Sequence, residues 1–178
     1  MFRKITLLGV VMTLIVIVLG ALNRLLGMEA LLGLIPAQEA HFKAAYALSA
    51  VVLTVLILSC WQVHCRATAI KMSFCLVILL GFQIVLGIGL LKSPDQVIQI
   101  TGHLLLGMMQ CWVFFWLYLR TDRDIAPLPD NDGPMWFTRL SMVLLFLQIA
   151  LGSWVSVNQA TLVCTGFPQC NGQWWPDA

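Results

Sequence analysis

The chain has 178 residues, of which 60% are hydrophobic and only 10% are charged, and its mean hydropathy is +0.91. A soluble domain carries about 25% charged residues, so the composition excludes an ordinary soluble globular protein. The net charge of +2 is too small to indicate a nucleic-acid partner, and no basic stripe runs through the chain. The few charges lie in short clusters between long apolar runs, which is typical of an integral membrane protein.

Five apolar runs are long enough to cross a lipid bilayer as helices, which takes about 20 residues each. No run alternates in the manner of a transmembrane β-strand, so the predicted fold is an all-α membrane protein with about five transmembrane helices. The first run is interpreted as a retained helix and not as a signal peptide, because no small-x-small cleavage site follows it. The expected helices are approximately Ile5–Leu22, Ala44–Trp61, Met72–Leu91, Ile100–Leu119 and Met135–Val157.

The distribution of positive charge predicts the orientation. If the N-terminus is cytoplasmic, the inner segments hold Arg3, Lys4, Arg66, Lys71, Arg120, Arg123 and Arg139. The outer segments then hold only Arg24, Lys43 and Lys92. Because positive residues gather on the cytoplasmic side, we expect a cytoplasmic N-terminus and an outer, periplasmic C-terminal tail in a bacterial inner membrane.

The runs and loops suggest three parts. Residues 1–120 are expected to form an N-terminal four-helix transmembrane bundle, residues 121–134 a cytoplasmic linker, and residues 135–178 a fifth helix with an outer tail. Short segments that end in a Leu-Gly pair resemble one another in three of the expected helices, at Gly20, Gly87 and Gly152. Either the likeness arises because apolar helices use few residue types, or it is a true repeat. In a true repeat the fifth helix would be the first helix of a second bundle, which is missing from this chain.

Two histidines are candidate ligands of a heme iron. His41 precedes the second expected helix and His103 lies near the start of the fourth, so both are expected at the outer face at a similar depth. Facing side chains at one depth are how a helical bundle holds a metal or cofactor, and neutral imidazole is a common iron ligand. In the alternative interpretation, His41 is an interfacial loop residue and His103 is a polar residue satisfied between helices. Small neighbours that would admit a porphyrin are Gly102, Gly107, Ala44 and Ala45.

Glu39 lies two residues before His41, beside this predicted site. A carboxylate there could move protons or orient the imidazole, and it is the candidate catalytic residue. The alternative is a solvated loop charge.

The cysteines fall into two groups. Cys60 and Cys65 lie near His64 on the cytoplasmic side, but this is a poor zinc pattern, and we interpret them as structural. Cys164 and Cys170 lie in the outer tail, where an oxidising compartment favours a disulfide between them. The sequence does not separate a structural disulfide from a redox-active dithiol.

Several motifs together resemble one family. The fifth helix carries Leu151-Gly152-Ser153-Trp154-Val155-Ser156, and the tail continues with C-x2-FP-x-C and then Asn171-Gly172-Gln173-Trp174-Trp175-Pro176. The fourth helix carries Ile100-Thr101-Gly102-His103, and the first ends in Leu19-Gly20-Ala21-Leu22-Asn23-Arg24. In these motifs the chain resembles the N-terminal part of the heme A synthase family.

The resemblance implies a specific chemistry. Members of that family have eight helices in two halves, each with a pair of heme-ligating histidines, and oxidise the C8 methyl of heme O to the formyl of heme A. The N-terminal half holds the substrate heme and the C-terminal half a heme b. Carried over, the resemblance implies that His41 and His103 bind the iron, that Glu39 is the outer-loop glutamate, and that Cys164 and Cys170 are the family's cysteine pair. It also implies that this chain is incomplete alone.

The chain departs from the family pattern beside the first histidine. Members place their glutamate three residues before that histidine and an arginine after it, whereas here the spacing is two and Phe42 follows. The alternative function is therefore a non-catalytic heme-binding or cytochrome oxidase assembly protein. The expected partners are heme, the lipid bilayer, a second copy or a C-terminal half, and heme O synthase or oxidase assembly factors.

Overall fold

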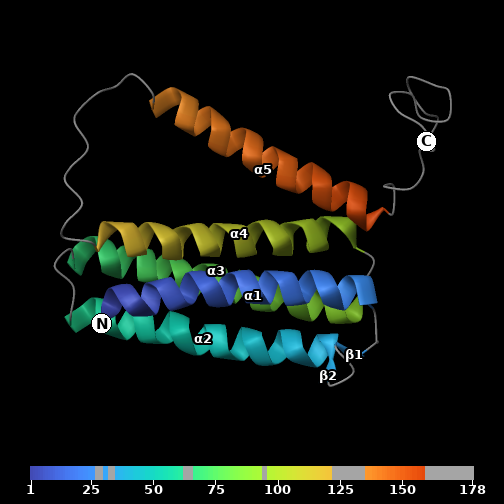
Figure 1. The fold of residues 1–178 in the computed structure, drawn as a ribbon, viewed down its shortest axis with the longest axis horizontal. Helices are drawn as coiled ribbons and strands as arrows, with labels where there is room; N and C mark the ends of the chain where they lie inside the picture. The colour runs from blue at the N-terminus through green and yellow to red at the C-terminus, as the bar shows by residue number, and fades with distance from the viewer. Residues whose placement is uncertain (27–29, 32–34, 62–65, 94–95, 122–134, 159–178) are drawn as a thin grey trace. The chain divides into compact units, whose positions relative to one another are not determined.

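A computed structural model describes residues 1–26, 30–31, 35–61, 66–93, 96–121 and 135–158 (Figure 1). The described residues contain five long helices, each apolar enough to cross a membrane. This confirms the predicted all-α, multi-pass membrane fold. The helices are α1 (Phe2–Leu26), α2 (Ala37–Trp61), α3 (Arg66–Lys92), α4 (Val97–Arg120) and α5 (Met135–Val157).

The connection between α1 and α2 differs from the prediction. Two short antiparallel strands, β1 (Ala30–Leu31) and β2 (Ile35–Pro36), pair within the segment expected to be a loop. Helix α2 then begins at Ala37, seven residues before the expected start at Ala44. Hydropathy missed this first stretch because it contains Glu39 and other polar residues, yet a carboxylate in the first turn favours a helix through the macrodipole.

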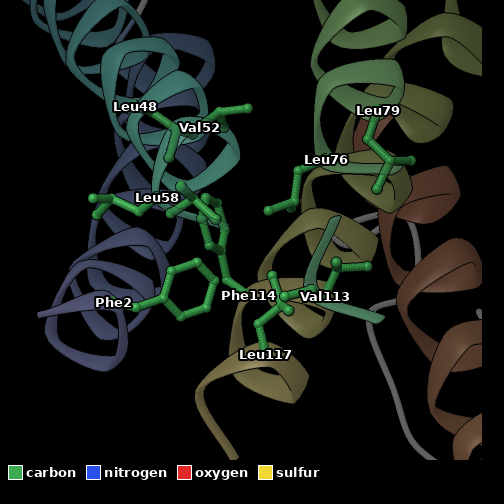
Figure 2. Packing of buried hydrophobic residues seen from close by; sticks show 11 residues of the cluster. Phe2, Leu48, Val52, Leu58, Leu76, Leu79, Val113, Phe114 and Leu117 are labelled. Atoms are coloured by element: carbon green, nitrogen blue, oxygen red, sulfur yellow. The ribbon is translucent and has the colours of Figure 1, made fainter. Parts of the chain in front are cut away.

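The first of two compact units comprises Met1–Val85 and Leu106–Pro129. Its helical segments pack around one apolar core, in which the Phe114 side chain is completely buried (Figure 2). The buried residues recur at three- and four-residue intervals, as in Val52 and Val55 of α2 and in Val113 and Leu117 of α4, so each helix turns one stripe to the core. The core residues are Phe2, Leu48, Val52, Val55, Leu58, Ala69, Leu76, Leu79, Val113, Phe114 and Leu117.

Buried hydroxyl groups in this unit are satisfied within their own helices. Thr13 donates to the Gly9 carbonyl at 2.7 Å, and Ser73 donates to the Ala69 carbonyl at the same distance. Ser59 donates to the Leu56 carbonyl. Because a polar group without a partner is costly in lipid, such local bonds let small polar residues occupy a transmembrane core.

The second unit comprises Leu86–Leu105 and Asp130–Ala178. Within it, the end of α3 lies against the start of α4. A Cβ added at Gly102 of α4 would be in van der Waals contact with the Leu86 side chain of α3. Thr101 of α4 and Ser153 of α5 are both buried, and their hydroxyl groups share a hydrogen bond of 3.1 Å. The expected division into residues 1–120, 121–134 and 135–178 stays a prediction.

The hydrogen bond between Thr101 and Ser153 is expected to stabilise the contact of α4 with α5 modestly. Double-mutant cycles on side-chain hydrogen bonds in membrane proteins average about 0.6 kcal/mol. Thr101→Val and Ser153→Ala should therefore show a coupling energy of about that size when unfolding is measured in detergent. Additive effects of the two substitutions would mean that the bond contributes nothing to stability.

Candidate functional site

His41 lies on α2 and not in the preceding loop, which corrects the expected position. The earlier start of α2 places it in the second turn of the helix, where its ring is partly buried against α1. A Cβ added at Gly20 would lie 3.1 Å from Cε1 and 3.3 Å from Nδ1 of this ring. The imidazole is therefore held in a gap that α1 leaves at a glycine.

One ring nitrogen of His41 has a defined partner. Nδ1 lies 3.0 Å from the carbonyl oxygen of Val16, one helical turn before Gly20 on α1. A carbonyl oxygen only accepts hydrogen bonds, so Nδ1 carries the hydrogen, and in the neutral ring Nε2 keeps the lone pair. A backbone carbonyl on one nitrogen with the lone pair on the other is the usual arrangement of a metal-ligating histidine. The chemistry of this donor therefore fits a heme iron.

Glu39 lies in the first turn of α2 and pairs with Lys43 at 2.7 Å. About half of its side chain is exposed, and that of Lys43 is 64% exposed. A shift of two positions along a helix turns a side chain to nearly the opposite face, so the ion pair and the His41 ring project in different directions. The Val16 carbonyl, and not Glu39, holds Nδ1 of His41.

His103 lies in the second turn of α4, as the sequence predicts, and is partly buried. Its ring also lies near a glycine of the preceding helix. A Cβ added at Gly87 of α3 would be 3.6 Å from Cε1 of His103, an ordinary van der Waals distance. Each candidate ligand is thus next to the glycine of a Leu-Gly pair, which the sequence showed only as a weak repeat.

Gly107 was expected to leave room for a porphyrin beside His103, and this stays a prediction. The space next to Gly107 is filled by Gln83 and Ile17, whose side chains would lie 3.2 Å and 3.4 Å from an added Cβ. Gly107 therefore serves the packing of α4 against α3 and α1. At Gly102 an added Cβ would lie 3.7 Å from Cδ1 of Leu86.

The two histidines belong to different compact units, His41 to the first and His103 to the second. Each is therefore described in its own surroundings, and their pairing stays a prediction. Among the described residues, no three His, Cys, Asp or Glu side chains gather as a metal site. Cys60 is a free thiol, whereas Cys65, His64, Cys164 and Cys170 lie outside the described residues.

Comparison with known proteins adds to this picture. Residues 40–178 match the COX15-CtaA family, described as "Cytochrome oxidase assembly protein". The match includes His41, His103 and the tail cysteines, and it covers well over half of the chain.

Individual relatives agree with the family match. A heme A synthase of Shewanella oneidensis is 35% identical over 107 residues, which are 58% of this chain and 32% of that protein. A heme A synthase of Alkalihalophilus pseudofirmus is 28% identical over 130 residues, or 68% of this chain and 43% of the relative. The chain thus spans between about a third and somewhat under half of these two relatives. No solved structure matches.

Proposed function

Because the chain belongs to the COX15-CtaA family of cytochrome oxidase assembly proteins, we propose that it is a heme A synthase-like membrane oxidoreductase of heme A biosynthesis. In this proposal the substrate is heme O, and its C8 methyl group is oxidised in successive steps to the formyl group of heme A. The balance requires one oxygen atom, as from water, and an external acceptor for four electrons. The relatives named heme A synthase support the assignment. The geometry of His41 is the structural observation that carries it, since Nδ1 donates to the Val16 carbonyl and the lone pair of the neutral ring, which a metal ligand needs, is then on Nε2.

His41 and His103 are the proposed ligands of the heme iron, one from each unit. The bound heme would supply the oxidisable methyl group and the redox-active iron. The chain's own part is to hold the imidazoles: the Val16 carbonyl fixes the hydrogen on Nδ1 of His41, and the Gly20 gap receives the ring. Both histidines are partly buried.

The chain spans only part of its relatives, so the activity of the whole protein is part of the proposal. The proposed partners are a second copy or a C-terminal half, and heme O synthase, which would deliver the substrate. The proposed Cys164–Cys170 disulfide would lie in the outer tail that leads toward that half, with the N-terminus on the cytoplasmic side.

An absorption spectrum of the chain purified in detergent tests the proposal first. A Soret band, a sharp α band on reduction, and formation of heme A from added heme O when a C-terminal half is co-expressed are the expected results. A folded, helical and colourless preparation that takes up no added heme would reject it.

A second candidate function is favoured by the position of Glu39. Its carboxylate is paired with Lys43 on an exposed face, which suits a non-catalytic heme-binding or oxidase assembly protein better than an enzyme that uses Glu39 at the heme.

Glu39→Gln distinguishes the two functions. If Glu39 moves protons during the reaction, the substitution should lower heme conversion by about 10²- to 10⁴-fold while heme binding is retained. Lys43→Gln is the matched control, because it breaks the same ion pair without removing the carboxylate. If both variants and the unmodified chain convert heme equally, Glu39 has no catalytic role, and the result favours the non-catalytic heme-binding or assembly function.

A further inference from the structure

We propose that Gly20 is a positioning residue for His41, and that the missing side chain at this position keeps Nε2 of His41 as the ligating nitrogen. The inference rests on the proposed function only in naming heme iron as the ligand. The structural part concerns α1 and α2 alone, both within the first unit.

A side chain at position 20 would crowd the ring of His41 and require the ring to shift. A Cβ there would lie 3.1 Å from Cε1, 3.3 Å from Nδ1 and 4.0 Å from Nε2 of His41. Carbon atoms in contact are usually about 3.5–4.0 Å apart. The edge formed by Nδ1 and Cε1 therefore faces Gly20, and an added methyl group would push this edge away from α1.

Displacement of the ring would weaken the bond that sets its tautomer. Nδ1 is 3.0 Å from the Val16 carbonyl oxygen, near the optimum for such a hydrogen bond, which weakens with distance and misalignment. The same oxygen accepts the backbone N–H of Gly20 in the helix, and its two lone pairs allow both bonds. Gly20 thus acts at two points, since it leaves space for the ring and lies one turn from the carbonyl that holds it.

Among the described glycines, only at position 20 would an added Cβ lie within 3.4 Å of a histidine ring. Gly87, in the equivalent Leu-Gly pair, is 3.6 Å from His103 by the same measure, so an alanine would fit there. Gly81 of α3 has no atom within 4 Å of an added Cβ. Gly81 therefore provides a matched control in a transmembrane helix of the same unit.

The first measurement is ¹⁵N NMR of the histidine rings in the heme-free chain. The chain has three histidines, so single substitutions assign the signals. We expect His41 to be protonated at Nδ1 and not at Nε2 in the unmodified chain and in Gly81→Val. In Gly20→Val the Nε2-protonated form should appear. Gly20→Ala is the milder variant if valine prevents folding.

The second measurement is heme affinity by titration. Loss of a group that orients a metal ligand typically lowers affinity by about 10- to 100-fold, and Gly20→Val should fall by this amount relative to Gly81→Val. Unchanged His41 signals in both Gly20 variants would overturn the positioning role, whether or not heme binds. The expected NMR change without heme binding to any variant would retain the role of Gly20 in holding the ring and reject the proposed function.

Discussion

Replacing Gly9 with valine is expected to lower the free energy of unfolding of the first unit by about 3 kcal/mol, at the upper end of the range for an overpacked core. A Cβ at this position would lie 2.8 Å from Cζ of Phe114 and closer still to Cδ1 and Cε1. The Phe114 ring is completely buried in the core and has little freedom to move aside. The higher helix propensity of valine than of glycine offsets only a few tenths of a kcal/mol.

Reversible unfolding in detergent measures this effect, and a double-mutant cycle assigns it. Phe114→Leu alone should destabilise the unit, but combined with Gly9→Val it should recover part of the loss, because the smaller side chain leaves room for valine. Gly81→Val is the control and should change stability by less than about 0.5 kcal/mol, since nothing lies near it. Independent, additive losses at positions 9 and 114 would contradict the close packing of α1 on α4.

The number and type of the helices were predictable because the bilayer leaves few alternatives. A run of about 20 apolar residues satisfies its backbone groups in lipid only as a helix or in a closed barrel. The ends were less predictable. Helix α5 begins and ends where expected, but α2 begins seven residues early at Ala37, directly after Pro36. Helices continue into the polar zone of the membrane, where hydropathy no longer marks their limits.

The histidines were predictable as candidates, but their surroundings were not. Polar residues that could ligate iron stand out in an apolar helix, and this identified His41 and His103. The partner of His41 is a backbone carbonyl, and its neighbour is a glycine, neither of which carries a chemical signature in sequence. Only the repeated Leu-Gly pair hinted at Gly20. The neighbours of Gly107, which are Gln83 and Ile17, were not predictable either, because a small residue in a helix indicates close approach without saying which group approaches.

Replacing His103 with alanine is expected to abolish stable heme binding. This loss of affinity is larger than the roughly 10- to 100-fold decrease caused by removing a group that only orients a metal ligand. The substitution removes a proposed iron ligand and creates no new contact with α3, because even a Cβ added at Gly87 would only reach van der Waals distance of the ring that is removed. The measurement is the Soret and reduced α bands of the purified variant, with helicity monitored by circular dichroism.

The matched control is His64→Ala, because the charge pattern of the sequence predicts that this histidine lies on the cytoplasmic side, away from the predicted site. It should bind heme as the unmodified chain does. Added imidazole should restore part of the spectrum of His103→Ala, since a small ligand can enter the space left by the side chain, whereas it should not rescue a misfolded variant. If His103→Ala kept its spectrum and His41→Ala lost it, the iron would be bound through His41 without His103, and the proposed pairing of these two histidines at one heme would be wrong.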